Sequence, residues 1–340
     1  MITSRRFLLA FAALAAIFAA LAWLAHFPTA DVPTASAPAP VPAIRFRLGL
    51  IPERNLYEQR RAFRALADYL DSHVNPKSRL STLDTGPSLH VELVTSSNYA
   101  GILHDFAHND IDGAFLGSLV AVLAVDRSGA QVLVKSESHS GKDTYAGTLF
   151  VPPDSPIHSL ADLRGKKIAA VRTTNAGSIF PLFAFQQAGI DRANEPQLLW
   201  SGTHDDVIEE VFAHRVDAGA VKDLRLDSWE QEHPGQNFRR LATGPRAPES
   251  ALVVTRDLPP DLRDALAATL LQMNRDPQAA PVLQALQLNR FVPCDISEYT
   301  PLYDMLDAIA PRWSETGVDG PPPLRPQVLT AATTAPNGGR

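Results

Sequence analysis

The scarcest side chain in this 340-residue chain is cysteine, because Cys294 is the only one. A single thiol excludes an internal disulfide and a cysteine-based zinc site. We expect Cys294 to behave as a small, partly buried hydrophobe. The chain also has no clustered run of lysine and arginine, and its net charge is −6 at pH 7. Nucleic acid is therefore not an expected partner, because a phosphate backbone needs basic groups to neutralise it.

Catalytic motifs are missing as well. The sequence has no phosphate-cradling Gly-x-x-x-x-Gly-Lys segment, no nucleophile elbow, and no paired carboxylates at predicted strand ends. His104 and His108 have the four-residue spacing of metal ligands, but no third ligand completes the set. A solvated helix face is the favoured interpretation of that pair. The sequence therefore predicts a protein that is not an enzyme and that needs no metal and no cofactor.

The N-terminus carries a targeting signal. Ser4-Arg5-Arg6 precedes an uncharged apolar run from Phe7 to Ala25, which is the order of a positive n-region and an h-region. The same stretch resembles a twin-arginine signal, and the run is also long enough to span a bilayer. Residues 1–27 are therefore interpreted as a signal peptide or a membrane anchor, without a cysteine for lipidation. Either alternative places the rest of the chain in the periplasm and limits membrane contact to this segment.

Two further segments have biased composition. Residues 28–43 are rich in proline and alanine, which indicates an extended linker. Residues 316–340 contain a Gly-Pro-Pro-Pro stretch followed by small polar residues, and we expect a disordered tail there. A hydrophobic fraction of 45% lets the part between them bury a full core.

The folded part shows short β-rich runs that alternate with helical patterns in two series. This alternation is typical of α/β proteins with largely parallel sheets. A helical block at the C-terminal end of the second series suggests that the chain crosses twice between two lobes. We place the crossings near 137–147 and 243–250, which are rich in glycine, serine or proline. The predicted lobes are 44–141 plus 246–315 for lobe 1 and 142–245 for lobe 2.

Polar residues follow several predicted strands. Ligands of open α/β sheets gather at the carboxyl ends of strands, where helix N-termini offer free N–H groups to anions. Small or polar residues stand at four such points, namely Gly117-Ser118, residues 172–178, residues 201–205 and Lys222-Asp223. We therefore expect an anion site at this edge of the sheets.

The segment 172–178 is the most informative of the four. Thr174 or Asn175 can cap the following helix, and hydroxyls such as that of Thr173 supply neutral donors. Gly177 is expected to let a ligand approach the backbone closely. Arg172 could pair with an anion through two hydrogen bonds. A capped helix without a ligand explains the segment about equally well.

Thr203 and Asp206 have the spacing of a capping box. His204 then becomes the first residue of a helix, at a strand end where it could donate to an oxyanion. The polar loop from His139 to Asp143 could line a cleft at the first crossing, although a linker needs no such role.

Several short motifs, taken in order, carry a resemblance to a known family. They are Leu48-Gly49-Leu50-Ile51-Pro52-Glu53, Asn98-Tyr99-Ala100, Ile111-Asp112-Gly113-Ala114-Phe115-Leu116-Gly117, Ser159-Leu160-Ala161-Asp162-Leu163-Arg164-Gly165-Lys166, Ser201-Gly202-Thr203-His204-Asp205 and Val216-Asp217-Ala218-Gly219-Ala220-Val221. Over nearly all of 44–310 the chain resembles the phosphonate/phosphite/phosphate-type (PhnD-like) periplasmic substrate-binding proteins of ABC transporters. The order and spacing of these motifs make the match specific.

The resemblance implies a type II periplasmic-binding fold, with two lobes joined by two hinge crossings. It also implies a ligand held by tyrosine, a Ser/Thr-rich helix N-terminus, a histidine and an acidic residue. Carried onto this chain, those positions are Tyr99, Tyr145, Thr173, Thr174, Asn175, His204 and Asp223. Together with the strand-end residues, the candidate ligand-binding set is Tyr99, Gly117, Ser118, Tyr145, Arg172, Thr173, Thr174, Asn175, His204 and Asp223.

One departure from the family pattern affects the choice of ligand. Where the family typically has Ser-Thr-Ser-Gly, this chain has Thr174-Asn175-Ala176-Gly177. Phosphonate, phosphite, phosphate and an arsenic oxyanion therefore all remain admissible. The expected partner is a membrane permease of an ABC transporter, and the alternative is a sensor kinase that reads a membrane-tethered sensor. An enzyme on the same fold is the least favoured interpretation.

Overall fold

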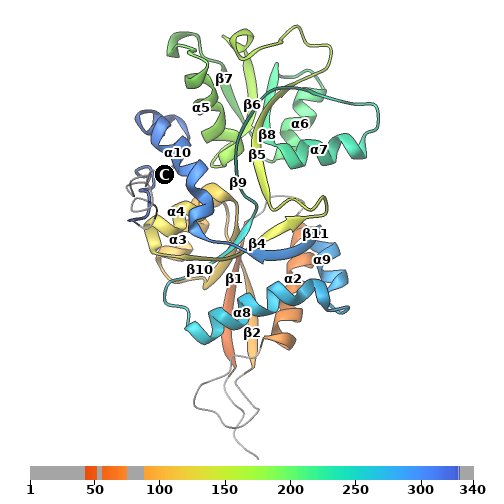
Figure 1. Ribbon diagram of the computed structural model, residues 1–340, viewed down its shortest axis with the longest axis vertical. Helices are drawn as coiled ribbons and strands as arrows, with labels where there is room; N and C mark the ends of the chain where they lie inside the picture. The colour runs from red at the N-terminus through yellow and green to blue at the C-terminus, as the bar shows by residue number, and fades with distance from the viewer. Residues whose placement is uncertain (1–42, 52–55, 75–87, 328, 330–340) are drawn as a thin grey trace, which may run out of the picture. The chain divides into compact units, whose positions relative to one another are not determined.

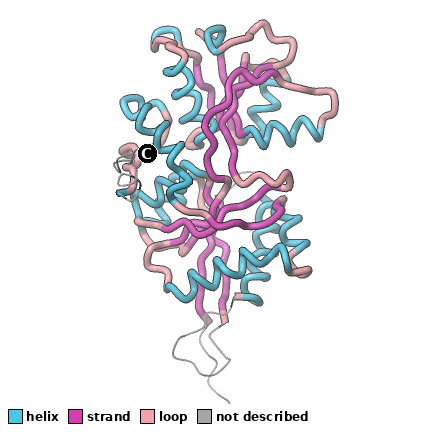
Figure 2. Tube along the Cα trace, in the orientation of Figure 1, coloured by secondary structure: helices cyan, strands magenta, loops and turns pink. Residues whose placement is uncertain are grey.

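The computed structural model describes residues 43–51, 56–74, 88–327 and 329. Its strands form a six-stranded and a five-stranded sheet, shown in Figures 1 and 2 with helices on both faces of each. The predicted signal or anchor segment, residues 1–27, lies outside the described residues, as does nearly all of the predicted linker. Among the helices that are described, none is long and apolar enough to cross a membrane.

The six-stranded sheet has the strand order β11-β4-β10-β3-β1-β2. Its strands are β1 (Ile44–Leu50), β2 (Leu89–Thr95), β3 (Gly113–Leu116), β4 (Gln131–Ser138), β10 (Ala251–Val254) and β11 (Leu288–Pro293). Buried residues of α2 (Leu56–His73), α8 (Pro260–Gln272) and α9 (Ala280–Leu286) cluster with one face, and those of α3 (Tyr99–Ala107) and α4 (Ser118–Ser128) belong to the other. A 3-10 turn, η4 (Met273–Arg275), follows α8.

The five-stranded sheet has the order β7-β6-β8-β5-β9. Its strands are β5 (Thr144–Val151), β6 (Lys167–Val171), β7 (Gln197–Ser201), β8 (Ala218–Lys222) and β9 (Arg239–Pro248). Helices α6 (His204–Phe212) and α7 (Asp223–Glu232) pack on one face. The other face meets the turn η2 (Asn175–Ile179) and α5 (Phe180–Gln187), and the connections include η1 (Leu160–Leu163) and η3 (Arg192–Asn194).

Strand direction explains where the two sheets connect. The chain leaves the six-stranded sheet after β4, crosses at 139–143, and returns between β9 and β10 at 249–250. β5 is antiparallel to β8, and β10 is antiparallel to β3, whereas β1, β2 and β3 are parallel to one another. The first strand after each crossing thus enters its sheet from the carboxyl edge of the parallel strands. Each sheet is therefore mixed, where the sequence pattern predicts largely parallel sheets.

Helix α2 shows how the sequence pattern positions an element. Leu66, Tyr69 and Leu70 share one face of the helical repeat, and all three are buried. Tyr69 also donates from its hydroxyl to Asp276 at 2.8 Å, which ties α2 to the turn after η4. The amphipathic pattern thus docks α2 against the six-stranded sheet.

The C-terminal block consists of η5 (Ile296–Tyr299), α10 (Thr300–Ile309) and η6 (Ala310–Glu315). Within residues 316–327, which composition assigns to a disordered tail, Thr316, Val318 and Pro323 are instead buried. Thr316 is fully buried, and the Trp313 indole N–H donates to the Gly320 carbonyl oxygen at 2.7 Å. Gly317 and Gly320 have φ of 71° and 77°, which lets the chain fold back on itself. Residues 330–340 of the predicted tail lie outside the described part.

Candidate functional site

A cavity of about 750 Å³ lies where the carboxyl ends of strands from both sheets meet. Its walls include residues that follow β1, β3, β6, β7 and β8. This is the edge at which α/β sheets bind ligands. The predicted residues that line it are Tyr99, Gly117, Ser118, Tyr145, Thr173, Thr174, Asn175 and His204.

The helix start after β6 forms one wall of this cavity. Thr173 has φ of 62°, a left-handed conformation that is costly for a β-branched residue and that occurs mostly where function requires it. The Thr174 hydroxyl donates to the Val171 carbonyl oxygen and accepts from the Gly177 N–H, both at 3.0 Å. Thr174, rather than Asn175, is thus the cap. It begins the π-helical turn η2, a rare geometry often found at functional sites.

Gly177 and Ser178 have structural roles in place of the ligand contacts expected from the sequence. A Cβ atom on Gly177 would lie 2.2 Å from the Val171 carbonyl oxygen, so only glycine allows η2 to pack this closely on β6. The Ser178 hydroxyl donates to the Thr174 carbonyl oxygen at 2.8 Å. Neither residue lines the cavity. The expectation that Gly177 admits a ligand to the backbone is therefore wrong.

Asn175 is the most unusual polar residue in the cavity wall. Asn175 is 1% exposed, and its amide makes no hydrogen bond of good geometry within the described residues, although the Tyr145 hydroxyl is near enough to interact with it. Leaving a buried polar group unpaired costs about 1–3 kcal/mol. Native proteins retain few such groups, and those that line a cavity are well placed to bind a polar ligand.

His204 lines the same cavity, as the first residue of α6. The capping box predicted from sequence is confirmed, since Thr203 accepts from the Asp206 N–H and Asp206 accepts from the Thr203 N–H. Burial and the neighbouring charge of Lys222 lower the pKa of His204 to about 3, with a smaller contribution from Arg225. His204 is therefore a neutral imidazole at physiological pH. Its Nδ1 is buried and has no partner within the described structure.

Ser118 and Tyr145 connect the two sheets beside this point. The Ser118 hydroxyl donates to the Pro248 carbonyl oxygen at 2.6 Å and is hydrogen-bonded to the Tyr145 hydroxyl at 3.1 Å. Burial raises the pKa of Tyr145, so that its hydroxyl keeps its proton. Gly117 precedes Ser118, and a side chain there would meet nothing within 4 Å.

Sequence reasoning missed an ion pair in the wall. The Lys222 ammonium lies 2.7 Å and 2.9 Å from the two carboxylate oxygens of Glu249 and 4.4 Å from the centre of the Tyr145 ring. Lys222 ends β8, and Glu249 lies in the second crossing. The only signal in the sequence was the polar Lys222-Asp223 strand end. No local pattern pointed to Glu249, because its partner is far away along the chain.

Two predicted residues lie outside the cavity wall. The Arg172 guanidinium stacks over the Trp200 ring at 4.9 Å and faces Gly317 of the C-terminal segment. Asp223 accepts the Ala146 N–H at 2.9 Å and pairs with Arg246 at 2.9 Å. Its carboxylate thus ties α7 to β5 and β9. Because neither Arg172 nor Asp223 lines the cavity, we leave both residues out of the proposed site.

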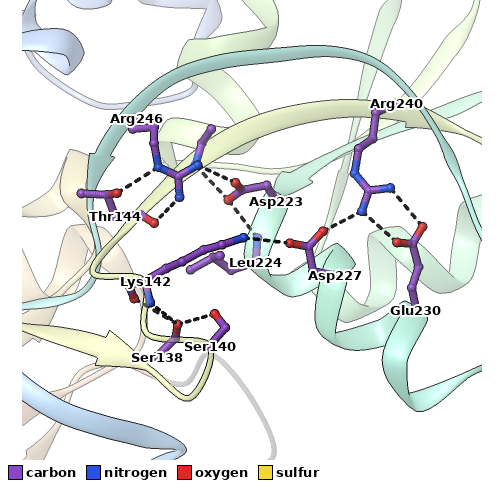
Figure 3. Close-up of polar contacts among 11 residues, drawn as sticks. Ser138, Ser140, Lys142, Thr144, Asp223, Leu224, Asp227, Glu230, Arg240 and Arg246 are labelled. Atoms are coloured by element: carbon purple, nitrogen blue, oxygen red, sulfur yellow. Dashed lines mark hydrogen bonds and ion pairs between the residues drawn. The ribbon is translucent and has the colours of Figure 1, made fainter.

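The loop of the first crossing contributes residues to which the sequence gave little weight. Ser138, His139, Ser140 and Lys142 all line the cavity. Figure 3 shows Lys142 reaching from this loop to Asp227 of α7, with 3.3 Å between the ammonium and the carboxylate. Asp227 is also bound by Arg240 at 2.7 Å. The contact joins the crossing to a helix of the five-stranded sheet at the rim of the cavity.

A search for related proteins identifies the family. The family model described as "ABC transporter, phosphonate, periplasmic substrate-binding protein" matches residues 48–299. The chain belongs to this family. Its members are substrate-binding proteins and not enzymes. This confirms the resemblance seen in the sequence and the expectation that the protein is not an enzyme.

Individual relatives are distant in sequence and similar in fold. The phosphonates-binding periplasmic protein of Escherichia coli K12 is 24% identical over 215 residues, which is 61% of this chain and 63% of the relative. The match thus spans less than two thirds of that protein.

Solved structures confirm the two-lobed fold. A Xanthomonas citri protein bound to ATP is 23% identical, with a TM-score of 0.65 over 80% of this chain and 98% of its own. PhnD1 of Prochlorococcus marinus, in complex with methylphosphonate, is 17% identical, with a TM-score of 0.63 over 78% of this chain and 98% of its own. A phosphonate-transporter binding protein of Pseudomonas aeruginosa is 17% identical, with a TM-score of 0.65 over 86% and 95%.

Proposed function

We propose that this protein is the periplasmic receptor of an ABC transporter, that it closes on a small phosphorus oxyanion, and that it presents the ligand to a membrane permease. The observation that carries the proposal is the buried amide of Asn175, which the described residues leave without a well-formed hydrogen bond, in the same cavity as the unpaired Nδ1 of His204. Both groups are neutral and can hydrogen-bond to oxygen atoms of a ligand.

The surroundings favour an anion at this point. Two helical segments, η2 and α6, begin at the cavity, and helix N-termini stabilise negative charge. Lys222 adds a cation beside them, although Glu249 already neutralises much of its charge. The names of two similar structures include methylphosphonate and ATP, and both ligands carry tetrahedral phosphorus with several oxygens. The proposed ligand-binding residues are Tyr99, Gly117, Ser118, Tyr145, Thr173, Thr174, Asn175 and His204.

Calorimetric titration tests this proposal. The purified chain would be titrated with methylphosphonate, phosphite, phosphate, arsenate and sulfate, and we expect heat with at least one phosphorus oxyanion. Asn175→Ala should weaken that binding by at least tenfold, while the unliganded protein keeps its thermal midpoint within a few degrees. The substitution removes unpaired buried groups at the same time as it opens a small cavity, and these effects oppose each other.

Asn194→Ala is the matched control, since Asn194 is exposed and bonds only locally to Asp191 through its side chain. It should bind as the parent does. An absence of heat and of thermal shift with all five anions would contradict the proposal, and so would an Asn175→Ala variant that binds normally.

Transport also implies a location. We propose that residues 1–27 direct export and that the chain acts in the periplasm, with the membrane reached only through this segment. Cell fractionation with an antibody separates the alternatives. A shortened chain in the soluble periplasmic fraction supports a released receptor, whereas full-length chain in the inner membrane supports the tethered sensor that would feed a histidine kinase.

A further inference from the structure

The cavity extends beyond its polar residues onto an apolar surface, which we call the aromatic wall. Its members are Phe63, Leu66, Phe115, Leu286, Leu288 and Phe291. The centroid of the Phe115 ring lies 5.7 Å from that of Phe63 and 5.5 Å from that of Phe291. The three rings are therefore in contact and form one continuous surface.

All of the aromatic wall belongs to the six-stranded sheet and the helices packed on it. Phe63 and Leu66 lie on α2, Leu286 on α9, and the others on β3 and β11. The groups proposed to hold the oxyanion, Asn175 and His204, lie on η2 and α6, which follow β6 and β7 of the five-stranded sheet. A movement of one sheet against the other thus leaves the wall intact, and a ligand bound at Asn175 would face it from within the same cavity.

Only part of the wall is accessible. Phe63, Phe115, Leu286 and Leu288 are partly buried, whereas Leu66 and Phe291 are buried within the core of the six-stranded sheet. Apolar surface that a ligand removes from water contributes about 25 cal/mol per Å². A bare phosphate or phosphite has no apolar atoms with which to obtain this stabilisation.

The size of the cavity supports the same conclusion. Its volume of about 750 Å³, before the lobes close, is an upper limit on the size of the ligand and leaves room for an organic group beside the oxyanion. A bare oxyanion consists of one central atom and a few oxygens, and it would fill only the polar end.

We propose, on the basis of the function proposed above, that the ligand is an oxyanion with an apolar, ring-sized organic group and that this group packs on the aromatic wall. The shared chemistry is a phosphorus oxyanion joined to a hydrocarbon ring. Two sources provide it, a phosphonate with a carbon–phosphorus bond and a phosphate monoester.

Paired titrations test the proposal, with methylphosphonate, phenylphosphonate and phenyl phosphate as probes. We expect phenylphosphonate to bind at least tenfold more tightly than methylphosphonate. Equal binding of phenyl phosphate would extend the ligand class to esters, whereas weak binding would restrict it to phosphonates. Phe63→Ala should reduce affinity for phenylphosphonate at least fivefold and change that for methylphosphonate less than twofold.

Phe212→Ala is the control, because Phe212 is 41% exposed on α6 and does not line the cavity. Leu286→Ala provides a second test of the wall should Phe63→Ala fail to fold. If phenylphosphonate binds no more tightly than methylphosphonate, the proposed role of the aromatic wall is wrong, while the oxyanion function stays in place. The same conclusion follows if a substitution in the wall lowers the affinity for both ligands equally. If no phosphorus oxyanion binds at all, the proposed function itself is wrong.

Discussion

At the scale of single residues, His204 lies at the start of α6 with the cations Lys222 and Arg225 nearby. A histidine in an unfolded chain has a pKa of about 6.5, and in the folded protein burial and these charges lower the pKa of His204 to about 3. In the unliganded protein the imidazole is therefore neutral at physiological pH. It can accept a hydrogen bond on one nitrogen and donate from the other without charging.

This shift predicts an acid-sensitive stability. Between pH 6.5 and 3 the unfolded chain binds a proton at His204 that the folded chain does not bind, so stability is fully present above about pH 6.5 and falls as the pH drops through this window. The contribution is at most about 1.4 kcal/mol per pH unit. In urea unfolding, the free energy of unfolding should fall less between pH 7 and pH 4.5 for His204→Asn than for the parent. His108→Asn, at the exposed cap that follows α3, should lose as much stability as the parent, and an equal loss in all three proteins would contradict the prediction.

Local spacing determined part of the site and could not determine the rest. The Thr203–Asp206 capping box needs only four neighbouring residues, so the sequence located His204 correctly. Strand ends are harder, because successive side chains point to opposite faces. Thr173 lines the cavity and its neighbour Arg172 does not. Lys222 lines it, whereas Asp223, the residue that the sequence favoured, does not.

At the scale of elements, the helix α7 is joined to the first crossing through Lys142 and Asp227 (Figure 3). The two side chains are partly exposed, at 46% and 36%, and such ion pairs contribute roughly 0–1 kcal/mol. We expect Lys142→Ala to weaken ligand binding by two- to fivefold, because the arrangement that holds the ligand loses one contact between the crossing and α7. The thermal midpoint of the unliganded protein should change by less than about two degrees.

Titration in low and high salt checks this prediction. The difference between Lys142→Ala and the parent should shrink at high salt, since screening weakens exposed pairs. Lys166→Ala is a suitable control, because Lys166 precedes β6 and lies at the amino edge of the strands, away from the cavity. A Lys166→Ala variant with the same loss of affinity would show that the effect is one of general charge.

The pattern of elements could be predicted from alternating strand and helix signals, but their directions could not. β5 and β10 are as apolar as the parallel strands beside them, so their sequences do not reveal their direction. Their direction is reversed because each follows a crossing between the sheets. The packed residues 316–327 were missed for a related reason. Their composition is that of a linker, and their order depends on contacts such as that of Trp313 with Gly320, which composition does not reveal.

At the scale of the whole molecule, the C-terminal block contacts elements of both sheets. Arg312 is 7% exposed and its guanidinium lies 2.7 Å from one carboxylate oxygen of Glu195, next to β7. Further along, the carbonyl oxygen of Asp319 accepts from Arg127 of α4 at 2.6 Å. The segment between them therefore follows one sheet and then the other.

Removal of Arg312 should reduce the stability of the whole fold. Loss of one partner of a buried ion pair leaves the other charge uncompensated and costs about 3–5 kcal/mol. Arg312→Ala should lower the urea midpoint accordingly at pH 7, while Arg256→Ala, at an exposed surface site, should leave it nearly unchanged. A loss below about 1 kcal/mol for Arg312→Ala would contradict this assignment.

The strand order of the six-stranded sheet also has a consequence for export. In that sheet β4 lies between β10 and β11, so neither neighbour of β4 exists until the chain beyond Ala251 has emerged. All strands of the five-stranded sheet lie between β5 and β9 in the chain, so its strand pairing needs nothing that follows, although α10 later covers one face. If the chain crosses the membrane unfolded, as an export signal in residues 1–27 would allow, the five-stranded sheet can pair its strands while β4 still presents two unpaired edges, which must be kept from pairing with other chains until β10 and β11 have followed.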